Sequence, residues 1–199
     1  MKDAKYFLIL FPFCIRMSLK IPKKGIAMQD IYDFEWEHLG DLSEGRPNLG
    51  SETSVLVYRL MQYSFKDVFS KEVGKKKTLD LFVKAGSLAG KAFCKNILDT
   101  SMPFAEFIAD LKEKLISLKI GILMIEEADE QKLEFVLTVS EDLDCSGLPI
   151  FGESVCDYDE GFIAGILEEY TGKKFRVKEI DCWATGDRTC RFKAKPIKG

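Results

Sequence analysis

The chain has 199 residues, of which 46% are hydrophobic and 31% are charged, and its formal net charge is −3. A chain of this length can bury a core without disulfide staples. Phosphate binding needs clustered Lys and Arg. Here the basic residues alternate with acidic ones apart from Lys75-Lys76-Lys77, which is typical of a solvated loop. We therefore exclude nucleic acid as a direct partner and expect a globular protein.

An apolar run covers residues 6–15. Ten residues are too few to span a bilayer as a helix, and no small-x-small cleavage site follows. We expect residues 1–39 to form an N-terminal arm that packs on a partner subunit in a homodimer. Residues 40–199 are then the ligand-binding domain. A signal or anchor is the alternative interpretation of the apolar run.

The region before the predicted strands carries helical patterns. Leu56, Leu60 and Tyr63 recur at helical spacing and predict the apolar face of a helix that Gly74 and the three lysines end. A second helix is predicted for residues 79–96 and a third from Pro103 onward.

Two glycines, Gly86 and Gly90, lie four residues apart in the second predicted helix. Glycine weakens a helix, so its presence needs a reason. The spacing indicates either close packing of another backbone on that face or room for a ligand.

In the rest of the chain, segments with the periodicity of a strand alternate with a segment that has the periodicity of a helix. Residues 120–126 and 133–139 predict a hairpin, residues 158–170 a helix, and residues 175–183 and 188–195 a second hairpin. This ββαββ order predicts an α+β fold, with a mostly antiparallel sheet packed against the N-terminal helices.

Six cysteines are present, and four of them, Cys145, Cys156, Cys182 and Cys190, lie in the C-terminal part of the chain. An even number permits a disulfide framework, but a chain with this much core does not need one. The clustering favours a metal site in a reducing compartment, so we expect a cytoplasmic protein.

Cys182 and Cys190 flank a turn centred on Gly186. Residues paired across a hairpin have Cβ atoms roughly 4.5–5.5 Å apart, so both sulfurs can reach one zinc ion. Cys156, at the start of the preceding helix, is the third candidate ligand. A cross-strand disulfide or two ordinary buried thiols are the alternatives.

The fourth ligand is open at this point. Glu179 lies three residues before Cys182, which in a regular strand places it on the opposite face. Either a β-bulge redirects Glu179, or Cys145 is the ligand instead. Four protein ligands leave no position for water, so the zinc is expected to be structural. His38, the single histidine, offers little for a His-based mechanism.

Five short motifs are shared with a known family. They are Gly45-Arg46-Pro47-Asn48-Leu49-Gly50, Ala85-Gly86-Ser87-Leu88-Ala89-Gly90, Cys156-x-Tyr158, Gly161-Phe162-x-Ala164-Gly165 and Glu179-x-x-Cys182-x-Ala184-x-Gly186-Asp187-x-x-Cys190-x-Phe192. Over residues 40–196 the chain resembles the vinyl-4-reductase domain family.

The resemblance implies a fold shared with subunits of the vesicle-tethering transport particle and a tendency to dimerise. Family members include a factor for vinyl-group reduction in bacteriochlorophyll synthesis and the sensor domains of activators that respond to phenols. Those sensors hold zinc with three Cys and one Glu. By motif these ligands fall on Cys156, Glu179, Cys182 and Cys190, which favours Glu179 over Cys145.

The chain departs from the phenol sensors at the ligand. They hold the phenol hydroxyl with a His and a Trp, whereas Phe107 and Phe135 occupy roughly comparable places here. A more apolar ligand or a larger ring system is therefore expected. The predicted pocket walls are apolar side chains from the third helix, the first hairpin and the fourth helix: Phe107, Leu111, Phe135, Leu137, Phe162 and Ile166.

These observations favour a zinc-containing binding or sensor domain for a small hydrophobic molecule, either aromatic or hydrocarbon-like. An enzyme or accessory factor in tetrapyrrole vinyl-group reduction is a second hypothesis, although no G-x-G-x-x-G follows a strand. A protein-assembly module is the third, by analogy of fold alone. The residues favour a role other than catalysis.

Overall fold

The structure of the chain is a computed structural model, which describes residues 32–197. The chain divides into two compact units, residues 1–38 and residues 39–199, and the second unit carries the α-helices, the sheet and the clustered cysteines described below. Residues 1–31 of the predicted N-terminal arm, including its apolar segment, residues 6–15, lie outside the described residues, so the arm's role in dimerisation stays a prediction. No helix within residues 32–197 combines the length and apolar character needed to cross a membrane.

Helices come before the first strand along the chain, as expected. The first elements are η1 (Trp36–Leu39), α1 (Leu42–Gly45), α2 (Val55–Val73), α3 (Lys75–Ile97) and α4 (Phe104–Ser117). They are followed by β1 (Ile122–Asp129), β2 (Glu134–Ser140), α5 (Asp157–Thr171), β3 (Phe175–Asp181), η2 (Trp183–Thr185) and β4 (Cys190–Pro196). The predicted ββαββ order and the α+β class are confirmed.

The four strands form one antiparallel sheet in the order β1-β2-β4-β3. The β2–β4 pairing, in which Leu137 lies opposite Phe192, joins the two hairpins. Burial alternates along β3, with Phe175 and Val177 buried and Arg176 exposed. One face of the sheet therefore borders the core and the other is solvated, which is common for antiparallel sheets.

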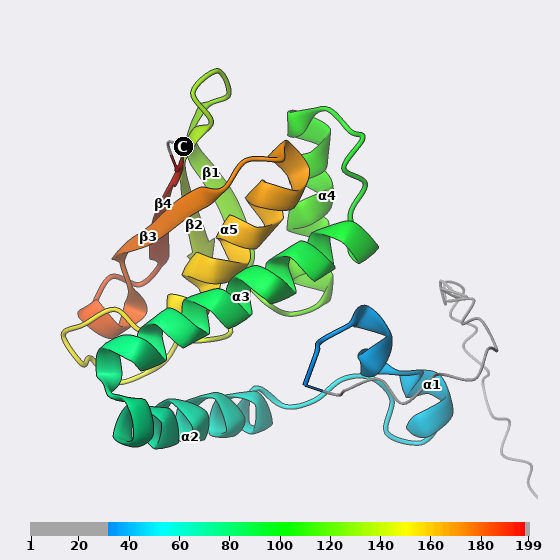
Figure 1. Cartoon of the computed structure of the whole chain (residues 1–199), viewed down its shortest axis with the longest axis vertical. Coiled ribbons are helices and arrows are strands. Elements are labelled where there is room, and N and C mark those ends of the chain that lie inside the picture. The colour runs from blue at the N-terminus through cyan, green and yellow to red at the C-terminus, as the bar shows by residue number, and fades with distance from the viewer. Residues whose placement is uncertain (1–31, 198–199) are drawn as a thin grey trace, which may run out of the picture. The chain divides into compact units, whose positions relative to one another are not determined.

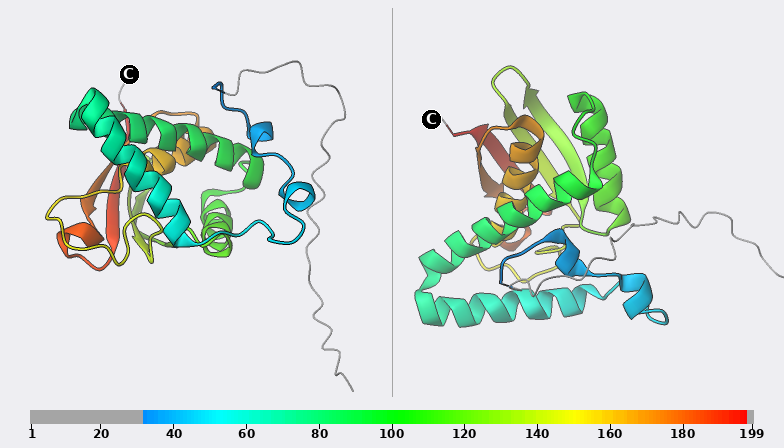
Figure 2. Two further views of the ribbon diagram at one scale, coloured as in Figure 1. Left: turned by 90° about the horizontal axis from the view of Figure 1, so that it is seen from below. Right: turned by 45° about the vertical axis from the view of Figure 1, so that its right-hand side comes forward.

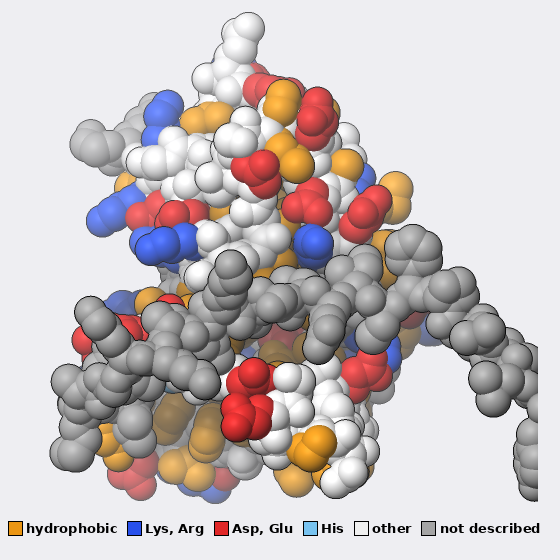
Figure 3. Space-filling model, turned by 90° about the vertical axis from the view of Figure 1, so that its right-hand side faces the viewer, with side chains coloured by type: hydrophobic (Ala, Val, Ile, Leu, Met, Phe, Trp, Pro, Cys, Tyr) orange, Lys and Arg blue, Asp and Glu red, His pale blue; other side chains and the backbone are white. Residues whose placement is uncertain are grey.

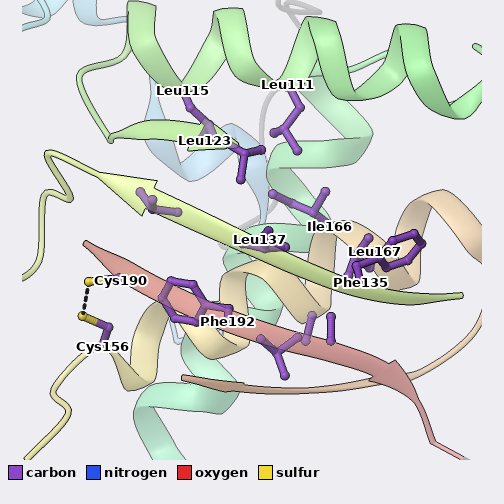
Figure 4. Packing of buried hydrophobic residues seen from close by; sticks show 14 of the residues in the cluster. Leu111, Leu115, Leu123, Phe135, Leu137, Cys156, Ile166, Leu167, Cys190 and Phe192 are labelled. Atoms are coloured by element: carbon purple, nitrogen blue, oxygen red, sulfur yellow. Dashed lines mark hydrogen bonds between the residues drawn. The ribbon is translucent and has the colours of Figure 1, made fainter. Parts of the chain in front are cut away.

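Helices cover the buried face of the sheet (Figures 1 and 2). α5 packs on β3, α4 packs on β1, and α3 crosses over α5 as an outer layer. Leu111 and Leu115 of α4 point towards Leu123 and Ile166, which brings α4, the sheet and α5 into one apolar cluster (Figure 4). On the upper part of the face in Figure 3, acidic and basic side chains are interspersed.

The α3–α5 contact is a contact between backbones. A Cβ added to Gly86 would meet the carbonyl oxygen of Tyr158, and one added to Gly90 would meet that of Phe162. Added Cβ atoms on Gly161 and Gly165 of α5 would likewise meet the backbone of α3. The glycines are required because no larger residue fits between the helices. The close-packing interpretation of Gly86 and Gly90 is confirmed, and the ligand interpretation is wrong.

α2 differs from its predicted orientation. Leu56 and Leu60, predicted on the apolar face of this helix, are 73% and 69% exposed, whereas Gln62 is the one buried residue of the helix. The helix presents its polar side to the protein, because buried acids in a loop described below provide hydrogen-bond partners there. The three lysines also do not form a loop. Gly74 separates α2 from α3, and Lys75 begins α3.

Candidate functional site

A β-bulge in β3 places two predicted metal ligands on one face. Glu179 pairs with Phe192 and Asp181 with Arg191, so Ile180 is an extra residue on this strand. Ile180 is exposed, whereas Glu179 and Cys182 on either side of the bulge are buried. The bulge thus turns Glu179 to the face of Cys182, which a regular strand could not do for residues three positions apart.

The other cysteines reach the same point from different elements. Cys190 begins β4 and lies opposite Val139 of β2. Cys156 is the N-cap residue of α5, and Cys145 lies in the loop after β2. The connection between the last two strands is wider than the predicted tight turn, because it contains η2 with Cys182 at its N-cap. All four of these cysteines are buried.

The four sulfurs of this cysteine cluster, Cys145, Cys156, Cys182 and Cys190, lie within 4.8 Å of one another. Cys156 Sγ is 3.8 Å from both Cys182 Sγ and Cys190 Sγ, and Cys145 Sγ is 3.0 Å from Cys190 Sγ. Four sulfurs bound tetrahedrally at about 2.3 Å from zinc lie roughly 3.8 Å apart. The cluster therefore has the size of a tetrahedral zinc site, and its thiols are free rather than paired in disulfides.

Glu179 is a fifth candidate ligand beside the four sulfurs. Its Oε2 accepts a hydrogen bond from the backbone N–H of Cys156 at 3.3 Å. Its Oε1 is buried and has no hydrogen-bond partner among the described residues. A buried carboxylate oxygen without a partner is costly, and a cation beside it would remove that cost. The donor set thus fits a metal ion either as four cysteines or as three cysteines with Glu179.

The protonation of these groups depends on their mutual contacts. Contacts with the other three sulfurs, that of Cys145 first, lower the pKa of Cys182. The contacts of Cys156 with its three neighbouring sulfurs raise the pKa of Cys156. Burial, together with the charge of Cys182, raises the pKa of Glu179 to about 8. A metal ion would favour the deprotonated form of each group that binds it.

The polar side of α2 holds the loop that carries Cys145. Asp144 accepts a hydrogen bond from Tyr58 at 2.6 Å and one from Gln62 at 2.5 Å. Arg59 donates to the carbonyl oxygen of Leu143 at 2.8 Å. The loop is thereby fixed at a helix more than 80 positions earlier in the sequence.

The loop that carries Cys156 is fixed by the same helix. Lys66 of α2 donates to the carbonyl oxygen of Val155 and to Asp157 Oδ2, the latter at 3.1 Å. Asp157 and Asp159 also lie in the first turn of α5, where the helix dipole favours acidic side chains. α2 therefore holds both loops that carry cysteines of the cluster.

An apolar cavity of about 50 Å³ lies between α4, β1, β2 and α5. The predicted pocket residues that line it are Leu111, Phe135, Leu137, Phe162 and Ile166. Phe107 does not line it: its ring is fully buried and stacks on Tyr170 with centroids 4.0 Å apart. A cavity of this size has room for roughly three or four water molecules and is about one third of the ~150 Å³ cavity that accepts benzene, so a single ring enters only if the walls move apart.

The sequence did not identify the acids around the two sites. Asp142, Asp144 and Asp159 lie in a loop and in a helix start, where acidic residues are commonly exposed, yet Asp142 and Asp144 are buried. Burial and the charge of Asp144 raise the pKa of Asp142 to about 7. Only the pairing of this loop with α2, a long-range contact, shows that these acids are internal.

Together, the sheet order, the helix layers and the cysteine cluster define an α+β domain with four clustered, buried cysteines. The family model for the vinyl-4-reductase domain matches residues 135–196, which span β2, α5, β3 and β4 and include the whole cysteine cluster. The resemblance that the motifs predicted is thereby confirmed.

Solved structures share the fold. A vinyl-4-reductase family protein from Methanocaldococcus jannaschii matches 75% of this chain and 85% of its own, with a TM-score of 0.53 and 20% identity. The second is the phenol-responsive sensory domain of the transcription activator PoxR, solved with phenol. The match covers 74% of this chain and 78% of that domain, with a TM-score of 0.58 and 13% identity.

A third structure is subunit 3 of the trafficking protein particle complex from Naegleria fowleri, covalently bound to palmitic acid. It matches 73% of this chain and 98% of its own, with a TM-score of 0.51 and 12% identity. An uncharacterized protein of M. jannaschii is 24% identical over 149 residues, which cover 75% of this chain and 81% of that protein. At these identities the likenesses establish the fold.

Proposed function

We propose that this chain is a zinc-containing binding or sensor domain for a small hydrophobic molecule. The observation that carries the proposal is the apolar cavity beside the cysteine cluster, since both are built from α5 and the same sheet. The PoxR sensory domain was solved with phenol, and its fold is the one found here. Free buried thiols suit a reducing compartment, so we place the protein in the cytoplasm.

The cavity can supply a useful affinity. Burial of roughly 200 Å² of apolar ligand surface contributes on the order of 5 kcal/mol before the entropic cost of binding. Ring stacking between Phe104 and Phe135, with centroids 5.0 Å apart, keeps one wall of the cavity ordered. A ligand of the size of a single ring requires the walls to move apart.

Ligand uptake tests this function directly. Native mass spectrometry and displacement of an apolar dye should show saturable binding of one small aromatic molecule per chain. The larger side chain in Ile166→Phe should fill the cavity and abolish uptake. Ile116→Phe, on the exposed side of α4, should bind as the wild type does. Uptake that is absent, or that Ile166→Phe leaves unchanged, would remove the proposal.

For the zinc site we propose Cys156, Glu179, Cys182 and Cys190 as ligands, with Cys145 as the alternative fourth ligand. The unpartnered Oε1 of Glu179 supports the carboxylate, because ligation would satisfy it. Zinc-edge X-ray absorption separates three sulfurs plus one oxygen from four sulfurs. We expect Cys145→Ser to retain zinc and Glu179→Gln to lose it. The reverse result would make Cys145 the ligand.

We also propose that the chain forms a homodimer through α2. The exposed face of this helix carries a row of large apolar side chains: Leu56, Val57, Leu60, Met61, Phe65 and Val68. Contiguous apolar surface of this kind marks interaction sites. A second copy of the same helix would offer a complementary apolar surface, as isologous dimers do.

A further inference from the structure

The apolar cavity has one polar end. Its lining is apolar except for two carboxyl groups, those of Asp142 and Asp159. Asp142 lies in the loop after β2 and Asp159 in the first turn of α5. Their carboxylate oxygens lie within 4.8 Å of each other, so the two acids share one end of the cavity. In an apolar pocket, a small number of polar groups fixes the orientation of the ligand.

Asp159 is distinguished by an oxygen without a partner. Its Oδ2 is shielded from solvent and has no hydrogen-bond partner among the described residues. Asp144 Oδ1, by contrast, accepts from Tyr58, and Asp157 Oδ2 accepts from Lys66. Buried polar atoms are nearly always hydrogen-bonded in native proteins. The open acceptor at Asp159 therefore marks a position where a donor belongs.

Among residues 32–197, no cationic side chain lines this end of the cavity. The described lining of the cavity contains no Lys, Arg or His. Arg59 donates to the backbone carbonyls of Leu143 and Ser146, and Lys66 is held by Val155 and Asp157. Two neighbouring carboxyl groups with no cation beside them are unfavourable at the end of an apolar cavity, and a positively charged donor would offset that cost.

A second metal ion is the competing occupant. Asp142, Asp159 and Cys156 lie close enough together to hold one. Such an ion would share Cys156 with the cysteine cluster, and it would leave the apolar volume of about 50 Å³ unfilled. A molecule with an apolar body and a charged nitrogen satisfies both features of the cavity at once.

We propose that the cavity selects a small apolar amine with a body no larger than a single ring, which it accommodates as its walls move apart, with the protonated nitrogen at Asp159 and Asp142. This inference rests on the proposed ligand-binding function and specifies the chemical class of the ligand. An ammonium group has several N–H donors, and charge-assisted hydrogen bonds to carboxylates are strong. The ring or alkyl body then contacts Leu111, Leu137 and Ile166.

Matched probes test this inference on the full chain. Benzylamine is compared with toluene, and cyclohexylamine with methylcyclohexane, by NMR titration. We expect each amine to bind at least tenfold more tightly than its neutral counterpart. Equal affinities would overturn the inference and leave the binding function intact. Failure of every probe to bind would overturn both.

Two variants locate the preference. Asp159→Asn keeps the shape of the side chain and should lose at least tenfold in benzylamine affinity, with toluene binding unchanged. Asp80→Asn alters the net charge equally on the exposed side of α3 and should bind both probes as the wild type does. An unchanged amine preference in Asp159→Asn would contradict the inference. Should that variant fail to fold, Asp142→Asn tests the same end of the cavity.

The metal alternative is tested on the same samples. Zinc content is measured before each titration for the wild type and for Asp159→Asn. We expect equal zinc content in the two proteins. A wild type with two ions per chain, of which Asp159→Asn loses one, would make Asp159 a metal ligand and refute the amine site.

Discussion

Buried carboxyl groups surround the cysteine cluster, and each needs a compensating partner. Five of them are below 10% exposed: Asp142, Asp144, Asp157, Glu160 and Glu179. Glu160 accepts a hydrogen bond from Lys178 at 2.7 Å, and Asp157 accepts one from Lys66. Since an uncompensated buried charge is strongly unfavourable, the residues that donate to these acids maintain the structure of the site.

Tyr58→Phe should therefore destabilise the protein. It removes the hydrogen bond to the buried Asp144 carboxyl group, which costs about 1–3 kcal/mol of the free energy of unfolding. Tyr63→Phe is the matched control, because Tyr63 donates at 3.0 Å to a neutral acceptor, the backbone carbonyl of Asp144. Urea denaturation should show a smaller loss for Tyr63→Phe. Equal losses would mean that the charge of the acceptor is unimportant.

At the scale of elements, the glycine contact between α3 and α5 sets the position of the cavity wall. Helix α5 carries Phe162 and Ile166 into the cavity, and its other side lies against the backbone of α3. A change in this spacing would shift both the wall of the cavity and Cys156 at the start of α5. The contact therefore couples the core to both proposed sites.

Gly165→Ala tests the contact. The added Cβ would meet the carbonyl oxygen of Ser87, which belongs to the backbone and cannot rotate away. We expect a loss of about 1–3 kcal/mol in the free energy of unfolding. In Gly45→Ala the added Cβ meets nothing within 4 Å, so stability should change by less than about 0.5 kcal/mol. Thermal unfolding of both variants distinguishes them, and an undestabilised Gly165→Ala would refute the close contact.

Most elements were predictable because their signals are local. The alternation over residues 133–139 and the Gly172 that caps α5 mark a strand and a helix end without tertiary information. The inverted orientation of α2 was not predictable. Its hydrophobic periodicity indicates a core face, but its polar side is bound by Asp144 from a loop more than 80 residues away.

For the site as well, the residues with a local sequence signal were predictable and those that depend on long-range contacts were not. The motif spacing identified Cys156, Cys182 and Cys190, and the bulge at Ile180 brings Glu179 to the same face. Spacing could not decide between Glu179 and Cys145, and the structure brings both to the cluster. Phe107 was assigned to the cavity because helical periodicity gives the buried face but not which neighbour a buried ring contacts.

At the scale of the whole molecule, α2 combines two roles. Its polar side fixes the loops of the cysteine cluster, and its apolar side is exposed. If a second copy covers the apolar side, dimerisation and the geometry of the proposed zinc site depend on the same helix. The proposed dimer would then influence ligand and metal binding through α2.

Leu60→Glu tests the dimer. A charge in the middle of the exposed row should convert the dimer to a monomer, because burial of an unpaired carboxylate is unfavourable. Leu118→Glu, at an exposed leucine beyond the end of α4, should remain dimeric. Light scattering coupled to gel filtration measures both masses. A Leu60→Glu protein with the wild-type dimer mass would rule out α2 as the interface.

Native mass spectrometry of the full chain, expressed with zinc supplementation, tests most directly whether the cysteine cluster is a metal centre. We predict one zinc ion per chain in the wild type and in Cys94→Ser, whose buried thiol lies outside the cluster. We predict none in Cys182→Ser. A wild-type chain that carries no metal, or whose mass reveals cysteines joined in disulfides, would contradict the proposed zinc site.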